Sequence, residues 1–345
     1  MPYRVPDAVH EPLYAVVPYF NPWRWKSREK HTFRAIQHFV DAGAVVYLIE
    51  AAFGERDFAF SQDVFKYMAV THPPVENHDP ALCAHKYIGI RTRHELWLKE
   101  NLINLAVQQL PPGWKYVCWL DSDVHFVRPN WVGETVHKLQ HYDFVQMFSH
   151  ARDVGPNYEI LPEDHPHADG VGFFHAFNEG VLDQKITRHG YHGPHKVWAG
   201  LAWAARRSAW DAVGGLIDCA IWGGGDWHMA HALVGRRQAM VRTDLHPNYI
   251  GHVNAWADRC DRHIRRNIGI VGGSILHYWH GPKVSRKYNE KHKILASCGF
   301  DPTRHLKRDA HGMWQLHDDG SEAYVKLRDS FRRIALERNE DANEV

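Results

Sequence analysis

The sequence predicts an α/β fold with a mixed, mainly parallel central sheet flanked by helices. A first apolar strand at 13–19 is followed by a helix at 27–41 and a second apolar strand at 44–49. Two strands that are joined through a helix lie parallel, with a right-handed crossover. A third apolar run, Tyr116–Leu120, is short and uninterrupted, as expected for a strand that is covered on both faces. In such sheets ligands bind at the carboxyl ends of the strands.

The composition is that of an ordinary globular protein. The chain has 345 residues, of which 44% are hydrophobic and 23% are charged. A formal net charge of +1 provides no overall field to attract a polyanion. Two local basic clusters, at 24–30 and 262–266, are interpreted as solvated surface in preference to a nucleic-acid interface.

Cysteine usage and hydropathy indicate a cytoplasmic protein without a membrane anchor, with which a bacterial or viral origin is compatible. The five cysteines are far apart and include no Cys-x-x-Cys pair, which favours reduced thiols. No leader opens the chain, and the longest apolar stretch, at 45–53, contains Glu50 and is too short to span a bilayer.

The remaining pattern predicts one domain without repeats. Residues 13–148 form a nucleotide-binding half, 198–290 form an acceptor and metal half, and 151–197 lose periodicity, as in an irregular insertion that either shapes an acceptor pocket or is plain surface. The other expected elements are helices at 93–110, 131–139, 208–213, 226–233 and 321–338 and strands at 124–127, 144–148 and 275–279.

Two carboxylates follow the third strand. Asp121 and Asp123, one residue apart, can place one carboxylate on a divalent cation and the other on a sugar or a metal-bound water. Alone this pair is more typical of a turn or an exposed strand end. At the ends of the first two strands, Pro18, Tyr19 and Glu50 are expected on the same edge, where Glu50 either accepts hydrogen bonds from a nucleotide base or is a structural acid.

Two later motifs can complete a site with these carboxylates. His277 and His280 flank the end of the last strand, and both rings can reach one cation only if the strand ends in a turn or bulge, because strand side chains alternate. Alternatively only one histidine binds. Three glycines, 223–225, precede Asp226 at the start of a helix. Asp226 is either a helix cap or a base within reach of an acceptor hydroxyl.

The order of these motifs resembles that of the GT-A (Rossmann-like) glycosyltransferases. It is most similar to the inverting branch with the β-1,4-galactosyltransferases and the bacterial family-two enzymes, over roughly residues 13–288. The resemblance rests on the following segments, in this order: Val17-Pro18-Tyr19-Phe20-Asn21, Asp121-Ser122-Asp123, Trp198 to Arg207 with Gly214-Gly215, Trp222-Gly223-Gly224-Gly225-Asp226, and His277-Tyr278-Trp279-His280.

The resemblance implies a metal-dependent inverting transferase that uses a nucleotide-sugar, with UDP as the favoured nucleotide and Mn²⁺ or Mg²⁺ as the cofactor. Asp123 would bind the metal, Asp121 would contact either the ribose or a ligand of the metal, and Asp226 would be the base; Gly225 departs from the pattern, which has a glutamate there. The other implied roles are metal ligation by His277 and His280, binding of the nucleotide by Pro18, Tyr19, Glu50, Lys283 and Arg286, and binding of the substrate by Trp198, Gly200, Trp222, Gly224 and Gly225.

Several alternatives remain open at this point. The acceptor is either a saccharide or envelope glycan, or a hydroxylated nucleobase in phage-type DNA. The rival functions are a metal-dependent nucleotidyltransferase, which also uses Asp-x-Asp, and a nucleotide-sugar-binding protein without catalysis, which would have no need of a base such as Asp226.

Overall fold

A seven-stranded sheet forms the centre of the molecule in the computed structural model, which describes residues 11–65, 85–162, 169–185 and 196–342. Its strand order is β11-β6-β10-β4-β1-β2-β3, and all neighbours are parallel except β10, which runs antiparallel to both β4 and β6. The predicted mixed, mainly parallel sheet is therefore confirmed. The strands are β1 (Leu13–Phe20), β2 (Val45–Phe53), β3 (Lys86–Thr92), β4 (Tyr116–Leu120), β6 (Phe144–Gln146), β10 (Ala202–Arg206) and β11 (Ile268–Ile270).

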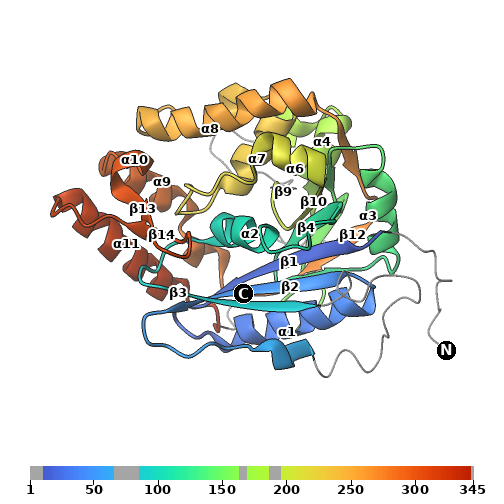
Figure 1. Cartoon of the computed structure of the whole chain (residues 1–345), viewed down its shortest axis with the longest axis horizontal. Helices are drawn as coiled ribbons and strands as arrows, with labels where there is room; N and C mark the ends of the chain where they lie inside the picture. The colour runs from blue at the N-terminus through green and yellow to red at the C-terminus, as the bar shows by residue number, and fades with distance from the viewer. Residues whose placement is uncertain (1–10, 66–84, 163–168, 186–195, 343–345) are drawn as a thin grey trace.

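Helices cover both faces of this sheet (Figure 1). On one face, α1 (Lys26–Asp41) and α3 (Trp131–Leu139) share a core with alternate residues of β1, from Leu13 to Tyr19. On the other face, Tyr14 and Val16 belong to a larger core with α2 (Lys99–Val107), α6 (Arg207–Val213), α7 (Gly225–Leu233) and α8 (Pro247–Arg259). Burial on both sides explains why the central strands are apolar without alternation.

A second sheet lies beside the first and has the strand order β5-β12-β7-β8-β9. The expected irregular insertion at 151–197 needs correction here, because its described parts contribute three of these strands and two short helices. The segments are β5 (Val124–Phe126), β12 (Ser274–His277), β7 (His150–Asp153), β8 (Asp169–Gly172), β9 (Lys196–Trp198), α4 (Phe173–Asn178) and α5 (Leu182–Lys185). Edge-to-edge backbone pairing needs no strong apolar period, so β7, β8 and β9 left no clear signal in the sequence, whereas β5 and β12 were expected at 124–127 and 275–279.

The C-terminal part gathers at one end of the sheet, where α9, α10 and α11 lie together in Figure 1. It consists of α9 (Tyr288–Ser297), α10 (Pro302–His305), the hairpin β13 (Leu306–Arg308) and β14 (Trp314–Leu316), and α11 (Glu322–Arg338). Ser321 caps α11 by accepting a hydrogen bond from the backbone N–H of Tyr324 at 3.2 Å. Short helical turns complete the chain: η1 (Gln62–Phe65), η2 (Arg237–Ala239), η3 (Cys260–Ile264) and η4 (Lys283–Arg286).

Some element boundaries differ from the sequence prediction. Glu50 does not end a strand, because β2 continues to Phe53 along the whole of β3, which the sequence analysis missed. The helix expected at 93–110 begins only at Lys99, since the backbone N–H of Trp97 donates to the carbonyl of Ile221 at 2.9 Å and holds the preceding residues in a loop. The strands expected at 144–148 and 275–279 end at Gln146 and His277.

Among the described residues, none of the helices combines the length and apolarity that a bilayer crossing demands. The four cysteines of the described part, Cys118, Cys219, Cys260 and Cys298, are unpaired, in agreement with the reduced thiols expected from the sequence.

Candidate active site

Strand pairing brings the first carboxylate motif and the two histidines together. Asp123 follows β4 and immediately precedes β5, which pairs antiparallel with β12 so that Val124 lies opposite His277. The pairing extends by one more bond, in which the backbone N–H of Tyr278 donates to the carbonyl of Asp123 at 2.7 Å. Residues more than 150 positions apart thus become neighbours through backbone register alone.

Asp123, His277 and His280 form a compact group of possible metal ligands. Their ligand atoms all lie within 4.8 Å of one another. Asp123 Oδ1 lies 3.7 Å from His277 Nε2, and Asp123 Oδ2 lies 3.3 Å from His280 Nε2. The strand β12 ends at His277, so the alternation of strand side chains no longer applies to His280, and both rings lie near Asp123, as is needed for a shared cation. Asp123 Oδ1 is buried without a hydrogen-bond partner, as expected of an atom that faces a cation.

His277 is held in place by a carboxylate that the sequence analysis did not identify. Its Nδ1 donates to Asp153 Oδ1 at 2.6 Å, from the register position opposite His277 on β7. Both side chains are buried. A carboxylate on Nδ1 fixes the neutral tautomer and leaves the lone pair of Nε2 directed at the ligand group, the usual arrangement behind a metal-binding histidine.

His280 is less well prepared for a metal. Its Nδ1 lies 3.3 Å from a guanidinium nitrogen of Arg338, which can only donate, so the imidazole proton lies on Nε2. That proton points to His277 Nε2 at 3.2 Å. Burial, together with the nearby charge of Arg286, lowers the pKa of His280 well below its ordinary value. The ring is therefore neutral, as a ligand must be, but its proton has to move before Nε2 can bind a cation.

We expect Asp153→Asn to weaken manganese binding by about 10–100-fold, because the amide no longer holds His277 in the binding tautomer. Binding is measured by titration of the protein with Mn²⁺ under electron paramagnetic resonance. Asp169→Asn is the matched control, since Asp169 lies on the adjacent strand and pairs with Arg152 in an exposed ion pair. Equal manganese affinity in both variants would contradict the role of Asp153.

A cluster of buried cations adjoins the histidines. Arg28, Arg286, Lys291 and Arg338 gather around one carboxylate, Glu340, which pairs with Arg28 and with Arg338 at 2.5 Å each. Burial would raise the pKa of Glu340, but the two guanidinium groups outweigh it and lower that pKa. Burial, reinforced by Arg338 and Arg286, lowers the pKa of Lys291 to about 7. Within this cluster positive charge exceeds negative charge, which suits an anionic ligand.

The C-terminal tail completes this side of the site. Asp341 accepts hydrogen bonds from the backbone N–H groups of Lys26 and Ser27 at 3.0 and 2.8 Å, so it caps α1 from the far end of the chain. The carbonyl of Ala342 accepts a hydrogen bond from the Trp279 side chain at 2.7 Å. A helix at 321–338 was predicted from the sequence, but no role was predicted for the residues after it.

Lys283 and Arg286 were both predicted to bind the nucleotide. Arg286 belongs to the cluster, whereas the Lys283 side chain lies outside the described residues.

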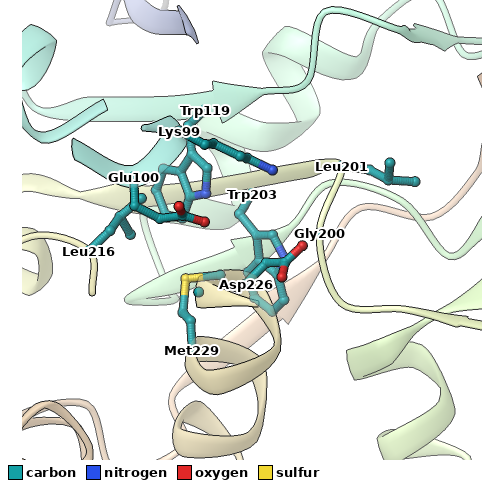
Figure 2. A pocket seen from close by; sticks show the side chains of 10 residues that line it. Lys99, Glu100, Trp119, Gly200, Leu201, Trp203, Leu216, Asp226 and Met229 are labelled. Atoms are coloured by element: carbon teal, nitrogen blue, oxygen red, sulfur yellow. The ribbon is translucent and has the colours of Figure 1, made fainter. Parts of the chain in front are cut away.

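Asp226 projects from the first turn of α7 at a point built from glycines (Figure 2). Gly223 and Gly224 have φ values of 87° and 93°, in the left-handed region that glycine alone adopts at low cost. The helix cap is Gly224, so the simple capping role considered for Asp226 does not apply, although its Oδ1 accepts a hydrogen bond from the N–H of Trp227 at 2.8 Å. A Cβ on Gly200 would collide with Asp226 Oδ2. Gly200 thus makes room for this carboxylate.

Lys99 connects the two acidic motifs and was missed by the sequence analysis. Its Nζ lies 2.5 Å from Asp121 Oδ1. Burial would lower the pKa of Lys99, but the charges of Asp121 and Asp226 outweigh it and raise that pKa above its ordinary value. Lys99 therefore stays charged between the carboxylate beside the metal group and the carboxylate on α7. Glu100, the next residue, lines the same pocket, as Figure 2 shows.

Under the transferase role that the resemblance implies, we expect Gly200→Ala to reduce sugar transfer by about tenfold or more, with little change in melting temperature, because the added methyl group displaces the Asp226 carboxylate from its position. Steady-state kinetics and thermal melting measure the two effects. Gly251→Ala is the matched control, since a Cβ at that helical position meets no atom within 4 Å. Full activity of the Gly200 variant would show that the close approach is irrelevant.

The three residues predicted at the nucleotide-base edge are internal. Pro18 and Tyr19 are buried within β1, and burial raises the pKa of Tyr19 above its ordinary value. Glu50 accepts hydrogen bonds from the backbone N–H groups of Ala59 and Phe60 and from the hydroxyl of Tyr87, at 2.7, 3.0 and 2.8 Å. Both carboxylate oxygens of Glu50 are thus engaged within the protein.

The two tryptophans predicted to bind substrate lie in different surroundings. The Trp198 ring packs edge-on against His277, with centroids 5.0 Å apart, and so adjoins the metal group. Trp222 stacks on Phe331 of α11 at 3.7 Å, which anchors the start of the glycine segment to the C-terminal helix. Gly224 and Gly225 lie between this anchor and Asp226.

Comparisons with known proteins return only distant similarities. No family model and no curated protein matches the chain. Among solved structures, a mycobacterial protein aligns at 13% identity over 89% of this chain and 83% of its own, with a TM-score of 0.38. The catalytic domain of Drosophila β1,4-galactosyltransferase 7, in complex with xylobiose, aligns at 12% identity over 93% and 98%, with a TM-score of 0.35.

A third structure, the Mycobacterium tuberculosis glucosyl-3-phosphoglycerate synthase in complex with Mn²⁺, UDP and phosphoglyceric acid, aligns at 14% identity over 84% of this chain and 76% of that one, with a TM-score of 0.35. Alignments this distant carry no argument about activity. The mixed, mainly parallel sheet expected from the GT-A resemblance is established by the strand order of this chain, and the function is argued from the geometry of its site.

Proposed function

We propose that this chain is a metal-dependent glycosyltransferase that moves a sugar from a nucleotide-diphosphate donor, with a UDP-sugar as the first candidate, to an acceptor hydroxyl with inversion. The observation that supports it most strongly is the metal-ligand group of Asp123, His277 and His280, joined through Asp121 and Lys99 to the carboxylate of Asp226. A protein that only bound nucleotide-sugars would have no use for this second carboxylate.

The donor set of the proposed metal centre fits Mn²⁺ or Mg²⁺. One carboxylate and two imidazoles leave coordination positions for phosphate oxygens, and imidazole favours Mn²⁺ over Mg²⁺. Asp123 and His277 are the principal ligands in this proposal, because their binding atoms need no rearrangement. When bound, the cation would offset the negative charge of the donor diphosphate.

The separation of charge within the site supports different places for donor and acceptor. The cations Arg28, Arg286, Lys291 and Arg338 lie beside the histidines and suit a diphosphate. The carboxylates of Asp226 and Asp121 lie around Lys99 and suit a neutral hydroxyl compound. The donor phosphates would therefore lie over the metal group, with the acceptor at Asp226.

In the proposed reaction Asp226 takes the proton of the acceptor hydroxyl. The acceptor oxygen forms a bond to the anomeric carbon of the donor sugar as the bond from that carbon to the diphosphate breaks. Its electron pair leaves on the diphosphate oxygen, where Arg286 and its cationic neighbours stabilise the added charge. Attack from the face opposite the leaving group inverts the anomeric configuration.

A saccharide acceptor is favoured over a hydroxylated nucleobase in DNA. A DNA acceptor brings phosphates, and Asp226 shares its pocket region with two further acids, Glu100 and Asp121, which act on Lys99. The nucleotidyltransferase alternative would use additional carboxylates around a second cation, whereas the possible metal ligands found among the described residues are Asp123 and two histidines.

The direct test is release of nucleoside diphosphate from a panel of nucleotide-sugars, with Mn²⁺ or with EDTA, in the presence and absence of methyl glycosides. The proposal predicts release that requires the metal and rises with one class of acceptor. Donor binding without release would indicate a binding protein, and release of pyrophosphate from a nucleoside triphosphate with a sugar phosphate would indicate a nucleotidyltransferase.

A further inference from the structure

Glu100 is a buried acid that lies directly against the residue before the proposed base. It belongs to the first turn of α2 and is 5% exposed. A Cβ on Gly225 would come within 2.7 Å of Glu100 Oε1. The Glu100 carboxyl group therefore occupies the space that a side chain at 225 would take. Figure 2 shows it facing the same pocket as Asp226, from the opposite wall.

The charges around Glu100 come from three other groups. Lys99 precedes it on α2, Asp226 faces it from α7, and Asp121 follows β4. Burial raises the pKa of Glu100 to about 8. The negative charge of Asp226 adds to this increase, and the positive charge of Lys99 opposes it. At neutral pH its carboxyl group therefore carries a proton and can both donate and accept a hydrogen bond.

The pocket between these groups suits a hydroxyl group. Its volume is about 10 Å³, which is room for about one water molecule. Trp119, Trp203 and Met229 provide apolar walls, and Gly200 and Gly225 leave the backbone close. An anionic group would meet the Asp226 carboxylate there, whereas a neutral hydroxyl fits both the size and the charge.

We propose that Glu100 positions the acceptor by binding the hydroxyl adjacent to the one that Asp226 deprotonates, so that the acceptor is a vicinal diol such as a sugar ring. This inference rests on the proposed transferase function and specifies its substrate class. The glycine at 225 is what allows an acid from α2 to reach this place. Glu100 takes no part in bond formation; it holds one oxygen while its neighbour attacks.

The test uses the whole chain of 345 residues and compares acceptors that differ by one hydroxyl group. Phenyl β-D-xylopyranoside, phenyl β-D-galactopyranoside and their monodeoxy analogues are assayed with Mn²⁺ and the nucleotide-sugar that the donor panel identifies. Wild type is compared with Glu100→Ala and Glu100→Gln. Glu134→Ala is the matched control, because Glu134 is likewise the acid in the first turn of a helix, α3, but pairs with exposed Arg128.

The wild type is expected to prefer a diol over its monodeoxy analogue by about tenfold in kcat/KM, the effect of one hydrogen bond. In Glu100→Ala this preference falls to about one. Glu100→Gln, which resembles the protonated acid in shape and charge, keeps most of the preference, and Glu134→Ala keeps all of it.

Three results would overturn the inference. In the first, Glu100→Ala keeps the full diol preference. In the second, Glu100→Ala loses activity equally on diol and monodeoxy acceptors, as expected for a merely structural residue. In the third, the wild-type enzyme transfers sugar to duplex DNA with hydroxymethylated bases but to none of the glycosides. In each case metal-dependent donor turnover persists and the proposed function stands. Absence of donor turnover with every nucleotide-sugar would remove the proposed function itself, and this inference with it.

Discussion

Asp226→Asn is expected to lower kcat for sugar transfer by about 10²–10⁴-fold, the usual contribution of a general base. Asparagine keeps the shape of the side chain and the acceptor position for the N–H of Trp227, but it cannot take a proton. The loss should therefore appear in kcat, with the affinity for Mn²⁺ and for the donor nucleotide nearly unchanged. Steady-state kinetics with saturating donor, combined with thermal-shift titrations of Mn²⁺ and nucleotide, measure both.

Asp211→Asn provides the control for this prediction, since Asp211 is an exposed aspartate on α6. It should retain wild-type kinetics. Turnover of Asp226→Asn at the wild-type rate would remove Asp226 from the role of base. A parallel loss of nucleotide binding would instead make it a residue that shapes the donor site.

The second large effect concerns the metal. Asp123→Ala is expected to weaken manganese binding by more than about 100-fold and to reduce transfer to background, because it removes the only carboxylate of the ligand group found in the described residues. His277→Ala should follow closely, since Asp153 prepares its Nε2 for binding. His280→Ala should lose less, because the contact with Arg338 holds the proton on the atom that faces the cation.

Manganese affinity of the three variants, followed by electron paramagnetic resonance, tests this order. Circular dichroism melting separates loss of a ligand from loss of fold. Wild-type affinity of Asp123→Ala would contradict the proposed centre, and a larger loss in His280→Ala than in His277→Ala would contradict the tautomers assigned to the two rings.

The sequence predicts the elements whose side chains carry a strong apolar pattern. The strands β1 and β4 and the helices α1 and α3 agree with the prediction to within about two residues, because burial on one or both faces determines their residues. Of the second sheet, β5 and β12 were predicted, whereas β7, β8 and β9 were missed, since backbone pairing defines them and Asp153 stands in no distinctive pattern.

For the candidate site, the sequence predicts groups that lie at recognisable places along the chain. Asp123 follows an apolar strand, and Asp226 follows three glycines. The groups that tune these residues come from elsewhere: Asp153 is 124 positions from His277, and Arg338 is 58 from His280. Lys99 and Glu100 stand in the first turn of an amphipathic helix and also line the pocket. In the sequence, the residue types of a helix start do not differ from those of a pocket wall, so these two residues were not identified. Such contacts depend on the complete fold.

The most direct test of the account is a crystal structure of the chain with Mn²⁺ and UDP, with the metal located by its anomalous scattering. The proposed site predicts an anomalous peak from a manganese ion bound by Asp123 and His277. The diphosphate oxygens should lie between that ion and the cluster that contains Arg286 and Lys291. A manganese ion bound away from Asp123, or a nucleotide whose diphosphate does not contact the metal, would contradict it.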